Sequence, residues 1–480
     1  MAGLSKPNII IIYYDDLGYG DLGCYSPSCV AKTPHTDALA ASGRRYTDAH
    51  SAASVCTPSR YSLLTGRYCW RTWLKRSVTD GYGPSVFTPG EATLPSYLSG
   101  LGYKTAMIGK WHLGFGNGEG RFTESSPVFP ERTVENWAIA SDNSPNTNGF
   151  HYSYVMSASL DFPPYMYIEN GLATEATSAH AEGYDEDGGV FMREGEATQG
   201  FDEVDVEPHF VAKVIDYIEA HSREGSERPF FLQYSSTGPH SPVVPTKENV
   251  SEAGDIYTAF LRQLDASVGR IVAALERTGL RDDTILILST DHGGRDWGYE
   301  AISGHKVNGS LRGEKAMLYE GGHRVPFIIS WPGKVDIGVS DHLVVQTDLF
   351  ATLADIIGSP LPDRVAMDGF SFAKDLVGGT TQSRSTRRTA VHHSFVGTFA
   401  YRSGPWKLIL DDQSGGFDGV YPELEMGGVP SPDKSGWRLF NLETDPGETQ
   451  DVRQENTDVF DRLVEEFELV RRSEGELVLA

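Results

Sequence analysis

The sequence is poor in cysteine and has no long run of apolar residues. Its four cysteines, at positions 24, 29, 56 and 69, are too few and too clustered for a disulfide framework, and no spacing of Cys and His is that of a zinc site. Cys24 and Cys29 could pair across a loop or remain free buried thiols, so the redox compartment stays open. No apolar stretch approaches the length of a membrane span, which predicts that the protein has no membrane partner.

Basic residues are also scarce relative to acidic ones. Lys and Arg number 41 against 66 Asp and Glu, which gives a formal net charge of −25. A chain this acidic is expected to repel nucleic acid and to be highly soluble. We therefore expect no nucleic-acid partner.

The apolar segments predict a large α/β domain. A chain of 480 residues is too long for most single hydrophobic cores, so one large and one smaller domain are expected. Continuous β-branched runs at residues 9–14 and 283–290 are typical of strands that are covered on both faces. Amphipathic periodicity at residues 204–221 and 255–278 predicts helices, so the first domain should be a doubly wound sheet flanked by helices.

The last hundred residues have a different character. After a polar linker near residues 378–383, the apolar segments become short. Predicted strands at 388–395, 406–410 and 437–442 are followed by a predicted helix at 458–471. We expect a small antiparallel sheet with one helix packed on it, and we divide the chain into residues 1–380 and residues 381–480.

Cys56 stands at the start of a predicted helix. A polar approach, residues 51–55, leads into Cys56, Thr57 and Pro58, and then into an apolar-periodic stretch. Pro58 lies where a proline in the first turn is tolerated, and the unpaired N–H groups of a helix start favour an anion. Arg60 would lie one turn further along the same face, so sulfur and cation would share a pocket. The common alternative for such a spacing is an inert buried cysteine.

The residues around this cysteine form a longer pattern. Cys-Thr-Pro-Ser-Arg at residues 56–60 is followed by Leu-Leu-Thr-Gly-Arg at residues 63–67. The pattern resembles the signature of the type I sulfatases of the alkaline phosphatase-like superfamily, among them arylsulfatases and N-acetylgalactosamine-6-sulfatases. In that family the cysteine becomes Cα-formylglycine through a formylglycine-generating or an anaerobic sulfatase-maturating enzyme. The resemblance therefore implies a formylglycine at position 56, such a maturation partner, and a large mixed sheet of the alkaline phosphatase-like type.

Two pairs of polar residues directly follow predicted strands. Asp15 and Asp16 form one pair, and Asp291 and His292 form the other. Ligands bind at the carboxyl ends of strands in open α/β sheets, so a cation site is expected there. The resemblance implies one calcium ion held by these four residues and Cys56, although the family more often has Asp-Asn at the second pair. Imidazole suits calcium poorly, so His292 leaves the metal's identity and its own coordination open.

Four further residues lie in other blocks that resemble the family. Lys110 and His112 belong to Gly-Lys-Trp-His-Leu-Gly, where alternate residues of an extended chain face one side. His240 lies in Pro-His-Ser-Pro, whose backbone is rigidly set by the prolines. Lys315 ends Leu-Arg-Gly-Glu-Lys, shortly before Glu-Gly-Gly-His-Arg-Val-Pro. The resemblance implies that all four residues act in catalysis.

The family chemistry assigns each residue a role. A hydroxyl of the hydrated formylglycine attacks sulfur in line, helped by the metal and by Asp291 as a base. The charge on the sulfuryl oxygens is stabilised by three cations, Arg60, Lys110 and Lys315. His240 is the expected general acid on the leaving oxygen. The proton of the second hydroxyl is then taken by a neighbouring base, for which His112 is the candidate, and sulfate leaves.

The substrate itself is less constrained. Residues 117–199 are rich in Gly, Ser, Pro and Asn, which is typical of loops that carry specificity. Asp161 could hold a sugar hydroxyl or serve a structural turn, and we predict Asp161 and His305 as substrate-binding residues. Because the sequence is similar to carbohydrate and aryl sulfatases, we expect a sulfated saccharide, with galactose or N-acetylgalactosamine as the sugar. An anionic substrate requires a locally basic site within this acidic chain.

Two other functions are compatible with these residues. One is a phosphonate monoester or phosphodiester hydrolase that uses the same formylglycine. The other is a non-catalytic binder of sulfated glycans, if Cys56 is never oxidised.

The location of the protein in the cell is also an expectation from the resemblance. Sulfatases of this type are commonly exported, but the apolar residues 9–12 are too few, and too soon followed by acidic residues, to form a signal peptide. We expect a periplasmic or extracellular enzyme whose leader is absent from this sequence, with the cytoplasm as the alternative.

Overall fold

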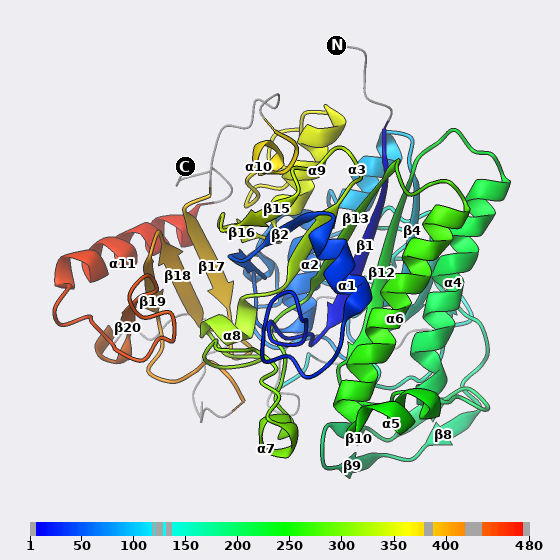
Figure 1. Cartoon of the computed structure of the whole chain (residues 1–480), viewed down its shortest axis with the longest axis horizontal. Coiled ribbons are helices and arrows are strands. Elements are labelled where there is room, and N and C mark those ends of the chain that lie inside the picture. The colour runs from blue at the N-terminus through cyan, green and yellow to red at the C-terminus, as the bar shows by residue number, and fades with distance from the viewer. Residues whose placement is uncertain are drawn as a thin grey trace.

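One large sheet dominates the structure, with a smaller sheet beside it (Figure 1). The computed structural model describes residues 6–117, 120, 128–130, 137–378, 387–417 and 434–473. Within these residues the large sheet has ten strands in the order β15-β2-β14-β13-β1-β12-β4-β5-β6-β7. Their bounds are β15 (Gly338–Ser340), β2 (Arg44–Tyr46), β14 (Phe327–Ser330), β13 (Thr284–Thr290), β1 (Asn8–Asp15), β12 (Phe230–Pro239), β4 (Lys104–Lys110), β5 (Tyr152–Met156), β6 (Ile168–Glu169) and β7 (Leu172–Ala173).

The centre of this sheet is parallel and its edges are mixed. Strand β1 pairs in parallel with β12 and β13, and β4 pairs in parallel with β12 and β5. Strand β14 runs antiparallel to β13 and to β2, and β6 runs antiparallel to β5. The carboxyl ends of β1, β4, β12 and β13 therefore lie at one edge, which is where polar residues can converge.

Helices cover both faces of the sheet. Along β1, Ile9, Ile11 and Tyr13 belong to one hydrophobic core, whereas Ile10 and Ile12 belong to the other. This alternation follows from the two-residue period of a strand, and it explains the continuous apolar run. One core includes residues of α2 (Cys56–Thr65), α3 (Leu94–Gly100) and α9 (Asp348–Ile357), and the other includes residues of α1 (Pro34–Ala41), α4 (Glu203–Arg223) and α6 (Ile256–Arg277).

Short elements complete the larger part of the structure. Paired strands are β3 with β16, β8 with β11, and β9 with β10. The bounds of the short elements are β3 (Ala49–His50), β8 (Ala179–Ala181), β9 (Tyr184–Glu186), β10 (Val190–Met192), β11 (Gly195–Ala197), β16 (Val344–Val345), α5 (Lys247–Ala253), α7 (Tyr299–Ser303), α8 (Glu320–His323), α10 (Ala373–Val377), and the 3-10 turns Cys69–Arg71 and Lys434–Gly436.

The C-terminal part forms a separate antiparallel sheet. Its four strands lie in chain order, and α11 packs on them through a shared core (Figure 1). The bounds are β17 (Thr389–His393), β18 (Phe399–Ser403), β19 (Trp406–Ile409), β20 (Arg438–Asn441) and α11 (Thr457–Arg472). The predicted boundary at residue 380 lies outside the described residues, so the division into two domains stays a prediction.

The expected fold class is confirmed: a large mixed sheet between helices, and a small antiparallel sheet with one helix. Residues 117–199 are predicted to be loops, whereas β5, β6 and β7 within them are strands of the large sheet. The sequence of β5, Tyr-Ser-Tyr-Val-Met, favours a strand but is only five residues long, so it gives no clear apolar run. The four cysteines are all free, which settles the open pairing of Cys24 and Cys29. Among the described helices, none is both long and apolar enough to cross a membrane.

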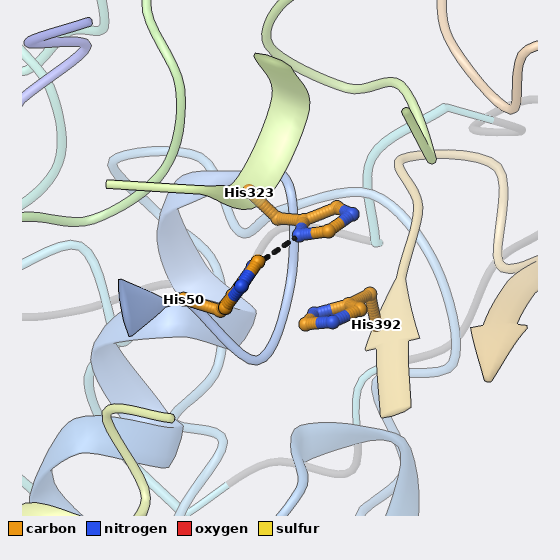
Figure 2. Close-up of side chains that lie close together, drawn as sticks. All are labelled: His50, His323 and His392. Carbon is orange, nitrogen blue, oxygen red and sulfur yellow. Dashed lines mark hydrogen bonds between the residues drawn. The ribbon is translucent and has the colours of Figure 1, made fainter. Parts of the chain in front are cut away.

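Three buried histidines join the small sheet to the large part of the molecule. His50 comes from β3, His323 from α8 and His392 from β17 (Figure 2). The Nδ1 atoms of His50 and His323 lie 3.0 Å apart, and the rings of His323 and His392 stack with centroids 3.6 Å apart and an interplanar angle of 9°. Because these two rings are parallel, an ion in the plane of one would lie far outside the plane of the other. We therefore interpret the cluster as packed, hydrogen-bonded imidazoles rather than as a metal site.

Candidate active site

Cys56 is the first residue of α2 and lies over the carboxyl end of β1. The preceding Val55 is extended, and helical geometry begins at Cys56. The Cys56 Sγ lies 3.6 Å from Asp15 Oδ1, at the end of β1, and 3.3 Å from His292 Nε2, just after β13. The helix start and the two strand ends, far apart in sequence, therefore meet at one sulfur atom.

The orientation of the His292 ring supports a cation site. Its Nδ1 donates to the carbonyl oxygen of Gly293 at 2.9 Å, so Nε2 carries the lone pair in the neutral ring. Burial lowers the pKa of His292, which favours that neutral form. This Nε2 lies 3.4 Å from Asp16 Oδ1 and 3.4 Å from Asp291 Oδ1. A lone pair that faces two carboxylate oxygens is repulsive unless positive charge lies between them, so this donor set fits a metal ion.

Fixed cations on the outer side pair with the carboxylates of Asp15 and Asp291. Arg60 donates from Nη2 and Nε to Asp291 Oδ2 at 2.9 and 3.1 Å, and Lys110 donates from Nζ to Asp15 Oδ2 at 2.5 Å. Burial raises the pKa of Asp15, but Lys110 and the other nearby cations outweigh burial and hold that pKa well below its usual range. Arg60 lies one turn beyond Cys56 on the same helix, as the spacing predicts.

Lys315 pairs with the remaining carboxylate. Its Nζ lies 2.8 and 3.0 Å from the two oxygens of Asp16. Burial lowers the pKa of Lys315, but Asp16 and its neighbours raise it above its ordinary value, so the amine stays charged. Lys315 therefore supplies a permanent positive charge beside Cys56.

The Cys56 thiol is itself a poor nucleophile here. The residue is only 2% exposed, and burial raises the pKa of its thiol above the ordinary value. Because the reactive form of cysteine is the thiolate, an unmodified Cys56 would be largely inert at neutral pH.

His112 presents an unpaired nitrogen to the site. Its Nε2 donates to the carbonyl oxygen of Thr79 at 2.7 Å, while Nδ1 is buried with no partner in the described part of the chain. Burial, and then the charge of Lys110, hold the pKa of His112 well below its usual range, so the ring is neutral. A neutral imidazole with a free lone pair can accept a proton.

His240 lies on the opposite side of the same space. Its Nδ1 donates to the carbonyl oxygen of Ser241 at 2.6 Å, which leaves Nε2 directed to the carboxylate of Asp16 at 3.9 Å. When the ring is protonated, Nε2–H is the proton available for transfer.

Four of these residues, Cys56, His112, His240 and Lys315, line one cavity of about 470 Å³. The others are not among its lining residues: Asp15, Asp16, Arg60, Lys110, Asp291 and His292. The described residues that line the cavity are Val55, Cys56, Val78, His112, Val128, Phe129, Ser159, Asp161, Phe162, Asp185, Phe191, Arg193, His240, Ser241, Arg295, Trp297, Lys315, Phe395 and Phe417.

Of the two predicted substrate-binding residues, one lines the cavity and the other does not. Asp161 lines the cavity, and its Oδ2 accepts a hydrogen bond from Arg193. Its Oδ1 is buried without a hydrogen-bond partner in the described chain and lies 3.9 Å from His240 Nδ1. His305 does not reach the cavity: it is 1% exposed and its Nε2 lies 2.7 Å from Asp21 Oδ1. The sequence block around His305 suggested a ligand, but the buried Asp21 carboxylate accounts for its position.

Ser159 lies in the same stretch as Asp161, within the loops expected to carry specificity, and it lines the cavity with a buried Oγ that has no hydrogen-bond partner in the described chain. Arg193, Arg295 and Trp297 line the cavity as well and were missed. They lie in segments without apolar periodicity, so no pattern placed them.

Comparison with known proteins agrees with this geometry. The family model described as Sulfatase matches residues 7–359. An N-acetylgalactosamine-6-O-sulfatase from Bacteroides thetaiotaomicron is 30% identical over 97% of this chain and 93% of its own. Human arylsulfatase A is 33% identical over 85% of this chain and 76% of its own. A solved structure from work on glycosaminoglycan metabolism by Bacteroides thetaiotaomicron superposes with a TM-score of 0.81 at 28% identity, covering 98% of this chain and all of that one.

The fold and the polar strand ends define a hydrolase with an alkaline phosphatase-like architecture. The matches are specific to one branch of that class and extend over nearly the whole chain. The chain belongs to the sulfatase family and is a sulfuric ester hydrolase.

Proposed function

We propose that the protein hydrolyses the sulfate monoester of a sulfated saccharide, with a formylglycine formed from Cys56. The observation that carries the proposal is the position of Cys56, which lines the cavity while its Sγ contacts the His292 nitrogen and the Asp15 carboxylate. The raised thiol pKa is a second support, because it speaks against the unmodified sulfur as nucleophile. A hydrated formylglycine supplies two hydroxyl groups, one to attack sulfur and one to expel sulfate.

The metal would be held by Asp15, Asp16, Asp291 and His292. The ion we propose is calcium, with the imidazole as its unusual ligand. When bound, a divalent cation supplies positive charge beside the sulfuryl oxygens.

The chain's own residues provide the remaining chemistry. Lys315 is fixed and charged on the cavity wall, so it can bind a sulfuryl oxygen without reorganisation. His240, held through Nδ1, donates a proton from Nε2 to the leaving oxygen. His112 accepts a proton at Nδ1 from the group at position 56 when sulfate is released. Arg60 and Lys110 act from behind Cys56 by holding the carboxylates of Asp291 and Asp15 in place.

The sugar would be recognised by the cavity wall. The unpartnered Asp161 Oδ1 can accept a hydrogen bond from a sugar hydroxyl, and Ser159 Oγ can bind a hydroxyl or a sulfuryl oxygen. A relative over nearly the full length is an N-acetylgalactosamine-6-O-sulfatase, so we propose N-acetylgalactosamine 6-sulfate as the first substrate to test.

The test combines mass spectrometry with a substrate panel. The protein is produced with a formylglycine-generating enzyme, and the peptide around Cys56 is examined for the aldehyde. Sulfate release is then measured from N-acetylgalactosamine 6-sulfate, galactose 6-sulfate and 4-nitrophenyl sulfate, beside a phosphonate monoester and a phosphodiester. An aldehyde together with sulfate release from a saccharide supports the proposal. Faster phosphonate or phosphodiester turnover would overturn it, and a persistent thiol with glycan binding alone would favour a binding protein.

A further inference from the structure

Arg295 stands on the cavity wall beside two aromatic rings. Its guanidinium carbon lies 3.9 Å from the centre of the Trp297 ring and 5.0 Å from that of Phe417. All three side chains line the cavity that contains Cys56. Arg295 also follows Gly294, whose carbonyl oxygen accepts a hydrogen bond from the Lys315 backbone at 3.1 Å. The backbone next to Arg295 is therefore tied to that of Lys315, and both side chains line the same cavity.

Arg295 differs from the other lysine and arginine of the cavity wall in having no carboxylate partner. Lys315 is paired with Asp16, and Arg193 is paired with Asp161. Within the described residues, no carboxylate oxygen lies within 4.0 Å of the Arg295 guanidinium. Asp185 lines the same cavity, but it is exposed and forms no ion pair with Arg295. Burial raises the pKa of Glu314, although Arg295 is near enough for its charge to oppose that rise. The Arg295 guanidinium is thus not held in an ion pair and can bind a ligand.

The platform under Arg295 is rigidly packed. Trp297 lies against Gly189, in the turn between β9 and β10, where an added Cβ would come within 2.7 Å of Trp297 Cδ1. The glycine therefore permits a contact that any other residue would block. A guanidinium held against a fixed aromatic face has limited freedom, so it loses less conformational entropy when it binds an anion.

We propose that Arg295 binds a second anionic group of the saccharide, distinct from the sulfate that is cleaved. The inference rests on the proposed function and names its substrate class as doubly anionic saccharides, with either a second sulfate or a uronic carboxylate. A planar guanidinium binds both groups through paired hydrogen bonds. In a chain with a net charge of −25, a local unpaired cation matters for holding such a ligand.

The test compares Arg295→Ala with wild-type protein on matched substrates. N-acetylgalactosamine 6-sulfate carries one anionic group, and N-acetylgalactosamine 4,6-disulfate carries two. A uronic acid linked to N-acetylgalactosamine 6-sulfate supplies a carboxylate as the second group. The quantity measured is the ratio of kcat/KM for each doubly anionic substrate to that for the singly anionic one. Arg277→Ala is the matched control, because Arg277 is an exposed arginine of α6 whose partner is Glu219.

We expect the wild-type enzyme to prefer at least one doubly anionic substrate, and Arg295→Ala to reduce that preference about tenfold through KM rather than kcat. The preference should weaken as salt is added, and Arg277→Ala should retain it. If the ratio for the disulfate falls in Arg295→Ala, the second group is a sulfate. If the ratio for the uronic acid substrate falls, it is a carboxylate. An absent preference in the wild type, or an equal loss on all three substrates, would overturn the inference.

If the proposed function itself is wrong, the experiment gives a different result. In that case no sulfate is released from any saccharide, and the same comparison is made by calorimetric binding of the three sugars to wild-type and Arg295→Ala protein. Tighter binding of a doubly anionic sugar that is lost in the variant would still support the anion site, and equal affinities would refute it.

Discussion

At the reaction centre, the protonation and chemistry of single side chains decide what can happen. Cys56 is buried, and its Sγ lies 3.6 Å from Asp15 Oδ1 and 3.3 Å from His292 Nε2. Even with this imidazole close by, burial raises the pKa of the thiol above its ordinary value, so the sulfur stays protonated. We therefore propose that oxidation of the cysteine to the aldehyde, rather than its ionisation, makes this position a nucleophile.

Replacement of Cys56 tests this interpretation. Cys56→Ser keeps a hydroxyl at the same place but cannot supply the second hydroxyl that expels sulfate. We expect turnover of 4-nitrophenyl sulfate to fall by on the order of 10³-fold or more, as for loss of a nucleophile in other hydrolases. Steady-state rates and the mass of the protein after incubation measure this. Near-normal turnover would mean that the modification is unnecessary.

Asp161 offers a residue-scale prediction about the sugar. Arg193 donates to Asp161 Oδ2, and its guanidinium carbon lies 4.0 Å from the centre of the Phe162 ring. Removal of this clamp in Arg193→Met leaves the carboxylate free to rotate, so the sugar hydroxyl loses an oriented acceptor. A charged hydrogen bond contributes about 1.5–3 kcal/mol, so KM for the saccharide should rise about tenfold or more.

The control for this prediction is the conservative change. Arg193→Lys retains a charge but not the planar stacking, and it should restore part of the affinity. If Arg193→Met changes kcat and leaves KM unaltered, Asp161 has another role.

At the scale of elements, α2 positions both Cys56 and Arg60. This helix ends at Gly66, which has a φ of 63° and lies so close to Ala366 that an added Cβ would come within 2.5 Å of the Ala366 Cβ. Gly279, which follows α6, has a similar φ of 73° but open space around it. An alanine at Gly279 would therefore introduce backbone strain alone, whereas an alanine at Gly66 would introduce the same strain and a steric clash.

We expect both alanine variants to be destabilised, but to different degrees. Gly279→Ala should lose about 1–2 kcal/mol of unfolding free energy, the cost of a left-handed conformation for an L-residue. Gly66→Ala should lose roughly 1–3 kcal/mol more, because the core must also move to accept the methyl group. The shifts of their thermal unfolding midpoints give the comparison, and equal shifts would contradict it.

The elements also explain which parts of the site the sequence could predict. Asp15 and Asp291 were predictable because each directly follows a long buried strand, and parallel strands bring such positions to one edge. Asp161 was predicted as a residue of the substrate pocket, but most of the other residues of the cavity wall were not. Arg193 and Asp161 are joined by short strands and turns that have no periodic pattern, and the pairing of His305 with Asp21 depends on a tertiary contact between distant segments.

The whole molecule adds a feature that no single element contains, the junction between its two sheets. Beside the His50, His323 and His392 cluster, Lys407 Nζ lies 3.0 Å from Glu320 Oε1 and 3.1 Å from His323 Nε2. The other charged groups that face the cluster are Asp48, Arg402 and Arg324, and Glu448, which pairs with Lys407. Opposite charges are balanced while the three imidazoles are neutral, so any added proton disturbs that balance.

Burial keeps the pKa of all three histidines below the ordinary value near 6.5. The unfolded chain therefore binds more protons than the folded one below that pH. The folded state therefore has its full free energy of unfolding above about pH 6.5. As the pH falls below that value, each histidine lowers the free energy of unfolding by up to about 1.4 kcal/mol per pH unit.

His392 is the residue through which to test this junction. Its Nδ1 donates to the carbonyl oxygen of Ser51 at 2.9 Å, and its Nε2 is buried without a partner among the described residues, so a proton there finds no acceptor. His392→Asn can retain a donor toward Ser51 but cannot titrate. We expect this variant to be less stable than wild type at pH 8, because packing is lost, yet to lose less further stability between pH 7 and pH 5. Denaturant unfolding across that range measures both slopes, and parallel pH profiles would show that the acid sensitivity arises elsewhere, for example at His112 or His292 in the active site.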